Sequence, residues 1–288
     1  MIAPLHRPNV VGIAALFLFA TAVTASAAER SVYLYAVEKQ SAAEWQAQLR
    51  KWQSEGIQRA IVSLEAGPKF LLADSSESYR LAELFNAAIL NGIRIEGLIL
   101  QDVSWALDPI GARERLGAVL DFAQLHPGLI DAVQIDVEVY TNSNIVEEGQ
   151  AWRAYAALLS TLHSEIERRR STMRLTAALP WWLSHAVSRD EFKTITSSLD
   201  GVLLMVYGDR GGTPVAADVA TFTRKVKPEI DILLGSGPRV RVGVAKYEHQ
   251  SSVALSQFAH GLDELLLAMP NFEGVTYFHE NTPFRTAI

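Results

Sequence analysis

Eight short apolar stretches alternate with helical patterns along this chain, and this repeat is the feature that most constrains its fold. The stretches are rich in β-branched and aromatic residues, as buried strands are, and the segments between them carry apolar residues at helical spacing. Strict alternation over about 250 residues predicts a single (β/α)8 barrel of the TIM-barrel class. An open doubly wound sheet is the alternative, but no Gly-rich phosphate-binding turn follows an expected strand. The expected strands cover residues 32–37, 59–64, 93–100, 128–140, 174–179, 200–207, 239–247 and 274–278.

Helical patterns fill the intervals between these strands. Ser41 followed by Glu44 is a capping-box sequence, which predicts that the first helix begins there. That helix is expected to end near Gly56, because glycine is a common stop signal. The later helices are expected near residues 76–91, 111–125, 147–170, 190–197, 215–232 and 251–269.

The amino-terminal residues have the pattern of a cleavable signal peptide. Arg7 precedes an apolar run over residues 10–23, and Ala25-Ser26-Ala27 supplies the small residues of a cleavage site. We therefore expect residues 1–27 to be removed and the barrel to span residues 28–288. The product would be exported to the periplasm or the medium without stable membrane insertion, and a single uncleaved anchor is the alternative.

Composition excludes several classes of partner and chemistry. The formal charge is −6 and no basic patch interleaved with aromatics occurs, so a nucleic-acid partner is not expected. The chain has no cysteine, so an exported barrel folds without disulfides. No metal-binding or cofactor motif is present, and neither is a G-x-S-x-G nucleophile elbow. The sequence leaves the oligomeric state open.

The stretch Asp131–Tyr140 carries an unusual polar row. In an extended strand Gln134, Asp136 and Glu138 point to one face, roughly 6.6 Å apart, between β-branched residues that point to the other. Polar groups inside a barrel must bond one another or a ligand, because burying them unpaired costs free energy. The alternative is an amphipathic strand whose polar face lies in water.

The active site of such a barrel lies at the carboxyl-terminal ends of its strands, where acids and aromatic residues dominate in this chain. Carboxylates transfer protons and flat aromatic rings contact the C–H faces of sugars, a combination that suits glycosidic bond cleavage. The residues expected at this edge are Glu38, Glu65, Gln101, Asp102, Asp136, Glu138, Trp181, Trp182, Tyr207, Glu248, Phe278, His279 and Glu280.

The segment Asp131-x-x-Gln134-x-Asp136-x-Glu138 resembles the DxxDxDxE signature on the fourth strand of glycoside hydrolase family 18, the chitinase family. Residues 175–180 are similar to the fifth strand of that family, and residues 200–207, with Met205-x-Tyr207, to its sixth. Residues 274–278 resemble its eighth strand. The resemblance thus spans the whole expected barrel and implies an exported, divergent chitinase-like hydrolase.

The resemblance also implies roles for individual residues. Glu138 would be the general acid, and Asp136 would orient the 2-acetamido group of the substrate, whose oxygen attacks the anomeric carbon. Tyr207 would hydrogen-bond that group, and Asp131, counted with the substrate-binding residues, would support the Asp136 network from below. The further substrate-binding residues expected are Gln134, Gln101, Trp181, Trp182, Phe278 and Glu248. The expected partner is a polysaccharide or oligosaccharide of N-acetylhexosamine.

Two other interpretations stay open. Glu138 and Glu248, at the ends of the fourth and seventh strands, would be the acid and nucleophile of a retaining glycosidase if their carboxyls lay roughly 5–5.5 Å apart. The chain also differs from the family pattern at Gln134, Gly208 and Phe278, where Asp, Asp and Trp are usual. A noncatalytic carbohydrate-binding barrel is therefore the competing class.

Overall fold

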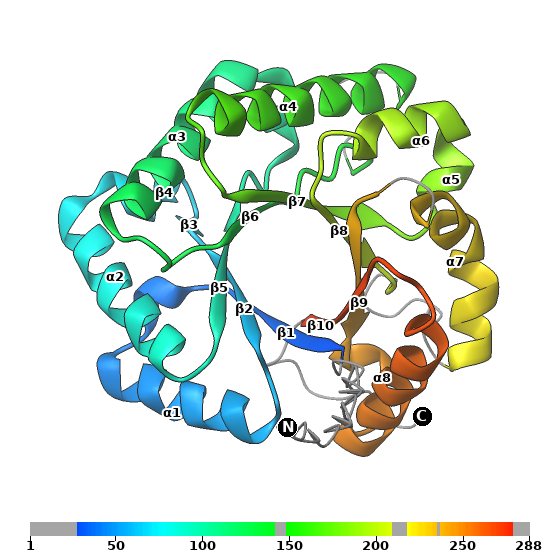
Figure 1. Ribbon diagram of the computed structural model, residues 1–288, viewed down its shortest axis with the longest axis horizontal. Coiled ribbons are helices and arrows are strands. Elements are labelled where there is room, and N and C mark those ends of the chain that lie inside the picture. The colour runs from blue at the N-terminus through cyan, green and yellow to red at the C-terminus, as the bar shows by residue number, and fades with distance from the viewer. Residues whose placement is uncertain (1–27, 142–147, 209–217, 235–236, 279–288) are drawn as a thin grey trace, which may run out of the picture.

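A closed barrel of eight parallel strands forms the centre of the molecule in the computed structural model, which describes residues 28–141, 148–208, 218–234 and 237–278 (Figure 1). The strands follow the order β1-β10-β9-β8-β7-β6-β5-β2, and the ring closes between β2 and β1. The predicted (β/α)8 barrel is thus confirmed, whereas the predicted signal peptide lies outside the described residues. The barrel strands are β1 (Glu29–Leu34), β2 (Arg59–Ser63), β5 (Arg94–Ile99), β6 (Ala132–Ile135), β7 (Arg174–Pro180), β8 (Gly201–Met205), β9 (Arg239–Ala245) and β10 (Phe272–Phe278).

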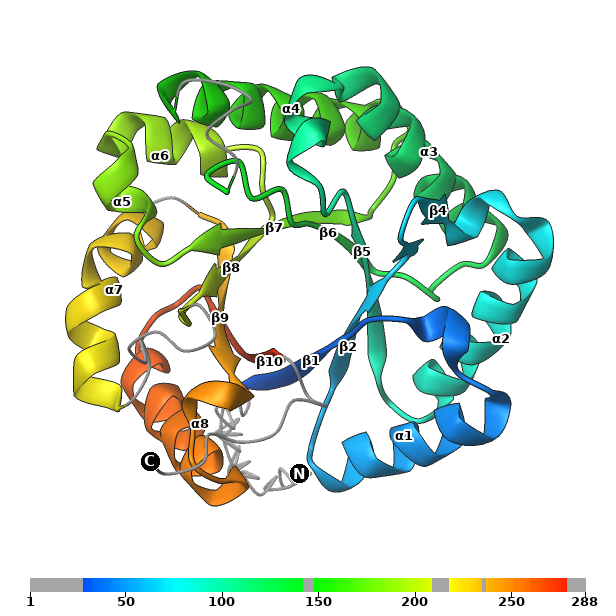
Figure 2. The ribbon, with the colours of Figure 1, turned by 180° about the vertical axis from the view of Figure 1, so that it is seen from behind.

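Helices surround the barrel on its outside in both views (Figures 1 and 2). The first helix begins at the predicted capping box, in which Ser41 accepts from the Glu44 amide and the Glu44 carboxylate accepts from the Ser41 amide. The helices are α1 (Ala42–Ser54), α2 (Ser75–Leu90), α3 (Pro109–Leu125), α4 (Glu148–Arg168), α5 (Leu183–Ala186), α6 (Arg189–Thr196), α7 (Val219–Leu233) and α8 (Ser252–Leu266). Short 3-10 helices cover Val37–Lys39, Leu71–Ala73, Val103–Leu107 and Lys246–Glu248.

Two elements were not expected from the sequence. A small hairpin of β3 (Glu65–Ala66) and β4 (Lys69–Phe70) follows β2, and its turn contains Gly67 at φ +60°. The short helix α5 directly follows the two tryptophans at the end of β7. Both elements are too short to produce a hydrophobic period in the sequence.

Apolar side chains separate into an outer and an inner layer, because successive strand residues point to opposite sides of the sheet. The outward residues and the buried stripes of the helices form the main core, to which Trp45 and Trp52 contribute from α1. The inward residues form a separate cluster inside the barrel, which includes Tyr33, Ile61 and Leu98. The side chains of this inner cluster fill the middle of the barrel, as is usual for this fold.

Charged residues fill the barrel near the amino-terminal ends of its strands. The buried Glu96 carboxylate accepts a 2.6 Å bond from Arg241 and lies 3.4 Å from Arg59. Burial opposes the ionisation of Glu96, but the two guanidinium groups outweigh it and lower its pKa to about 2. Ion pairing therefore allows charge to remain inside this end of the barrel.

Two further features concern the chain as a whole. Gly274 lies so close to β1 that a Cβ at this position would meet the Glu29 carbonyl oxygen at 1.9 Å, so the pairing of β10 with β1 requires glycine. Within the described ranges, the helices are too short or too polar to cross a membrane.

Candidate active site

The acidic pair Asp136 and Glu138 lies just beyond the end of β6. The sequence predicted a strand through Tyr140, but β6 ends at Ile135, where its last pairing with Ile99 of β5 also ends. Burial still alternates past this point, because Val137 is buried whereas Asp136 and Glu138 are partly exposed. The predicted polar row thus persists although the strand does not.

Gln134 is the buried member of this row. Its side chain is fully buried, and Nε2 donates a 2.9 Å hydrogen bond to the hydroxyl of Tyr33 inside the barrel. An uncharged amide fits this buried position, because a carboxylate there would carry a charge that burial penalises. Gln134 therefore supports the floor of the site beneath Asp136.

Asp136 has a strongly altered proton affinity. Burial, and then the charge on Glu138, raise its pKa from 3.8 to about 7. The charge on Asp136 in turn raises the pKa of Tyr155, a buried residue of α4, after the larger effect of burial. Near neutral pH the Asp136–Glu138 pair therefore holds one proton for much of the time, as two coupled carboxyl groups do.

Glu138 is held by an aromatic neighbour. The hydroxyl of Tyr140 donates a 2.8 Å hydrogen bond to its Oε1. The Tyr140 ring stacks on Trp152 of α4 at 6.0 Å and meets the edge of Trp182 at 4.9 Å. These contacts fix the position of the Glu138 carboxylate at the mouth of the barrel.

Aromatic rings line the mouth next to this pair. Tyr207 and Phe278 stack with their ring centres 4.7 Å apart and their planes at 5°, and Phe278 meets Tyr33 edge-on at 5.6 Å. Tyr35 stacks on Tyr33 at 5.8 Å and is 37% exposed. Burial raises the pKa of Tyr207, and the charge on Asp136 contributes to the shift. The structure thus brings Tyr207 and Phe278 into the environment of the acidic pair.

Gln101 leaves the neighbouring strand at the same edge of the barrel. It follows β5, which pairs with β6, and its Nε2 donates a 2.8 Å bond to the hydroxyl of Ser63. The amide nitrogen is thereby fixed, and the carbonyl oxygen of the same amide can accept a hydrogen bond from a ligand.

The two tryptophans after β7 lie in different surroundings. Trp182 contacts Tyr140 and therefore belongs to the environment of Glu138. Trp181 packs against an outer apolar cluster that includes Phe222 of α7 and Phe258 of α8, and it lies 5.6 Å from the ammonium group of Lys225 of α7. Of the two, Trp182 is the one placed to contact a ligand at Glu138.

The structure ties Glu248 to the loop after β8. It is buried at the end of β9, and Oε1 accepts a 2.8 Å bond from the backbone amide of Gly208. The Glu248 carboxylate thus holds the backbone at Gly208, directly after Tyr207.

Asp131 lies at the opposite end of β6 from the acidic pair. It accepts bonds of 2.6 and 3.1 Å from Arg59 and one of 3.3 Å from Arg174. The four residues between Asp131 and Asp136 extend along the strand, which places Asp131 in the ion-pair cluster at the base of the barrel. The support from below that the resemblance implies for Asp136 stays a prediction.

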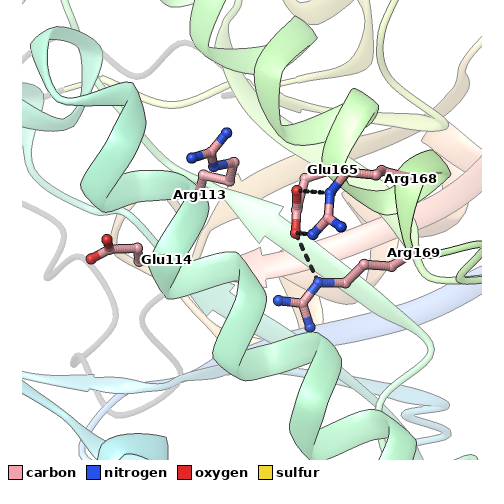
Figure 3. A pocket seen from close by; sticks show the side chains of 5 residues that line it. All are labelled: Arg113, Glu114, Glu165, Arg168 and Arg169. Atoms are coloured by element: carbon pink, nitrogen blue, oxygen red, sulfur yellow. Dashed lines mark hydrogen bonds and ion pairs between the residues drawn. The ribbon is translucent and has the colours of Figure 1, made fainter.

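Two cavities lie away from the mouth of the barrel. One of about 300 Å³ lies between α3 and α4, where Glu165 accepts bonds from Arg168 and Arg169 (Figure 3). Another of about 400 Å³ lies between α1 and α8. Figure 3 shows the Glu165 carboxylate bonded to the two arginines that follow it in the chain, so we assign this cluster to helix packing.

Metal binding has no support in this part of the molecule. Among residues 28–141, 148–208, 218–234 and 237–278, no group of three or more His, Asp or Glu side chains is arranged to hold a metal ion. His279 and Glu280, which the sequence placed at the mouth, lie outside the described residues.

The sequence interpretation missed several tyrosines of the site. Tyr33 and Tyr35 alternate along the first strand, and Tyr140 follows Glu138 at the same spacing of two. This spacing was a usable signal, since it places their rings on the side of the polar row. Tyr155 gave no comparable signal, because it occupies an ordinary apolar stripe of a helix.

Comparison with known proteins supports the fold but gives no sequence relative. No protein-family model and no curated protein sequence matches the chain. A family 18 chitinase from Pseudoalteromonas aurantia has a similar structure, with a TM-score of 0.59 and 12% identity over 87% of this chain and 93% of that chain. An endo-1,4-β-mannanase from Rhizomucor miehei gives a TM-score of 0.56 and 10% identity over 88% and 85%.

A third similar structure is the xylanase and α-amylase inhibitor protein XAIP-II from Scadoxus multiflorus. Its TM-score is 0.51 at 11% identity, over 87% of this chain and 92% of that chain. At such identities the similarity establishes the fold alone, a barrel like those of glycoside hydrolases. The architecture expected from the family resemblance is confirmed at this level.

Proposed function

We propose that this chain is a divergent relative of the family 18 barrels and an exported glycoside hydrolase. Its substrate would be a polysaccharide or glycan that contains N-acetylhexosamine. The observation that carries the proposal is the pair Asp136 and Glu138 at the barrel mouth, in which the pKa of Asp136 is raised to about 7 beside a second carboxyl group. Glycosidic cleavage requires such a pair of carboxyl groups in different protonation states. Export rests on the signal-like pattern of residues 1–27.

In the proposed reaction Glu138 gives its proton to the leaving glycosidic oxygen. Its Oε1 accepts from Tyr140, so the proton shared by the pair would be delivered from Oε2. As the bond from the anomeric carbon to the leaving oxygen breaks, the acetamido oxygen of the same sugar bonds to that carbon. Water then attacks the anomeric carbon and gives a proton to Glu138, while the bond between that carbon and the acetamido oxygen breaks and the acetamido group is restored. Two successive inversions at the anomeric carbon retain its configuration.

Asp136 and the neighbouring rings would position the reacting sugar. Asp136 would accept a hydrogen bond from the acetamido N–H, which orients the acetamido oxygen toward the anomeric carbon. Tyr207 would donate to the acetamido oxygen, while the partly exposed rings of Tyr35 and Trp182 contact sugar C–H faces.

A noncatalytic carbohydrate-binding barrel is the second candidate. The stack of Tyr207 on Phe278 and the bond from Gln134 to Tyr33 occupy the mouth with side chains of the protein itself. The fold is also that of a protein described as an inhibitor. Binding without turnover would fit these observations.

A matched pair of substrates separates the candidates. Chitotetraose and cellotetraose differ in the group at carbon 2, which is acetamido in the first and hydroxyl in the second. We expect release of reducing ends from chitotetraose alone. Cleavage of cellotetraose that is lost in Glu248→Ala would favour the Glu138/Glu248 mechanism, and binding of chitotetraose without release would favour the noncatalytic barrel.

A further inference from the structure

Glu65, the first residue of β3, accepts hydrogen bonds from the backbone just after the end of β5. Its Oε1 lies 3.3 Å from the amide nitrogen of Leu100, and its Oε2 lies 3.4 Å from the amide nitrogen of Gln101. One carboxylate thus accepts from two successive backbone N–H groups of a neighbouring strand. Such a pair of converging N–H groups forms a concave anion-binding site in the backbone.

The backbone that Glu65 contacts has an unusual conformation. Leu100 has φ +57°, in the left-handed region that a leucine rarely adopts, and its side chain is fully buried. A non-glycine residue remains in this region only where its surroundings hold it there. The Glu65 carboxylate can hold Leu100 in this conformation, because it accepts hydrogen bonds from both backbone amides that the left-handed turn brings together.

The left-handed turn changes the direction of the next side chain. Leu98 points into the barrel and Ile99 into the outer core, so a regular strand would point Leu100 inward and Gln101 outward. Instead, Leu100 lies in the outer core with Ile99. Gln101 turns inward, where its Nε2 reaches the hydroxyl of Ser63 at 2.8 Å.

Arg115 of α3 holds Glu65 in turn. Its Nη1 donates a 2.9 Å bond to Oε1 of Glu65. The same guanidinium lies over the ring of Phe70 at 4.7 Å and over the ring of Trp105 at 5.0 Å. The carboxylate is therefore fixed from the outside by an arginine that is itself packed between two rings.

We propose that Glu65 is a positioning residue that holds the turn at Leu100 and thereby directs the Gln101 amide into the mouth of the barrel. Gln101 lies there beside the residues that follow β6, because β5 and β6 are paired up to Ile99 and Ile135. Its carbonyl oxygen accepts a hydrogen bond from a hydroxyl or amide of the sugar. The second part of this inference rests on the proposed function, whereas the first does not.

The structural part is tested with Glu65→Gln, which keeps the size of the side chain and removes its charge. We expect amide hydrogen exchange at Leu100 and Gln101 to become at least tenfold faster, and a crystal structure to show Gln101 released from Ser63. Glu77→Gln is the matched control, because Glu77 is also half-buried and accepts from an arginine, Arg80, but this partner belongs to its own helix, α2. Unchanged exchange and an unchanged Gln101 in Glu65→Gln would overturn the proposal.

The ligand part is tested with chitotetraose and the pair Glu65→Gln and Gln101→Ala. If Glu65 acts through Gln101, each variant raises KM about three- to tenfold with kcat changed less than twofold, and the double variant is no worse than Gln101→Ala. Additive effects would overturn a role through Gln101. If the wild-type protein neither binds nor cleaves chitotetraose, the proposed function fails, and the exchange measurement still decides the role of Glu65.

Discussion

The hydroxyl of Tyr140 donates a 2.8 Å hydrogen bond to Oε1 of Glu138. The two residues are separated by one position and keep the alternation of β6 beyond the end of the strand. Since the Tyr140 ring is packed between Trp152 and Trp182, the bond connects the acid to the helix layer and to the loop after β7. A long, flexible side chain at the mouth of a barrel is thereby given one orientation.

Tyr140→Phe removes this hydrogen bond and keeps the ring packing. A hydrogen bond to an uncharged carboxyl group contributes about 0.5–1.5 kcal/mol, so we expect kcat for chitotetraose to fall roughly twofold to tenfold. Steady-state kinetics measure the effect, and thermal unfolding verifies that the fold is retained. An unchanged kcat would show that Tyr140 does not orient Glu138 for catalysis.

Asp136 makes the stability of the protein depend on pH. Its folded-state pKa of about 7 lies above the ordinary 3.8, so between these values the folded state binds more protons and stability falls as the pH rises. Asp136→Asn removes this penalty, which is on the order of 4 kcal/mol above pH 7 and absent below pH 4. Urea unfolding at pH 4 and pH 8 measures the difference between variant and wild type.

The exposed Asp231, which pairs with Lys227 on α7, offers a control for this measurement. Asp231 is exposed, so burial does not raise its pKa as it raises that of Asp136. We therefore expect Asp231→Asn to give no stabilisation at pH 8. An equal effect of Asp136→Asn at both pH values would contradict the raised pKa.

Glu96 has the opposite linkage to pH. Its folded-state pKa of about 2 lies below the ordinary 4.5, so its contribution to stability is present above pH 4.5 and is lost as the pH falls toward 2. Glu96→Gln leaves Arg241 and Arg59 with less compensation inside the barrel, and we expect a loss of about 3–5 kcal/mol at pH 7. The same substitution at the exposed Glu167 should change stability by less than about 0.5 kcal/mol in the same urea titration.

The adjacent tryptophans provide a matched test of sugar contact. Trp182 touches Tyr140 at the acid, whereas Trp181 packs toward Lys225. Loss of an aromatic contact costs about 0.5–1.5 kcal/mol, so Trp182→Phe should weaken chitotetraose binding by up to about tenfold and Trp181→Phe should leave it unchanged. Calorimetric titration compares the two variants, and equal affinities would show that Trp182 does not contact the sugar.

The barrel was predictable because its signals are local. Each apolar run, and caps such as Ser41 with Glu44, report on a few neighbouring residues, and eight repeats leave few alternative folds. The end of β6 was not predictable in this way. β6 ends where its neighbour β5 ends, because the left-handed conformation of Leu100 stops the pairing of the two strands. No residue pattern within 128–140 marks this end.

The site was predictable where it follows the strand alternation. Asp136, Glu138 and Tyr207 lie at the predicted edge and share one environment. The role of Asp131 stays a prediction, because motif spacing does not show which partners its side chain meets, and here they are Arg59 and Arg174. The role of Glu65 depends on three separate segments that only the folded chain brings together.

The central claim is that Glu138 supplies a proton in a carbohydrate site, and Glu138→Gln tests it most directly. Release of reducing ends from chitotetraose and calorimetric binding of the same sugar are measured on wild type and variant. We predict that the variant loses about 10²- to 10⁴-fold in kcat, as expected for a general acid, and retains the affinity within a few-fold. Cleavage at an undiminished rate by Glu138→Gln would contradict the account.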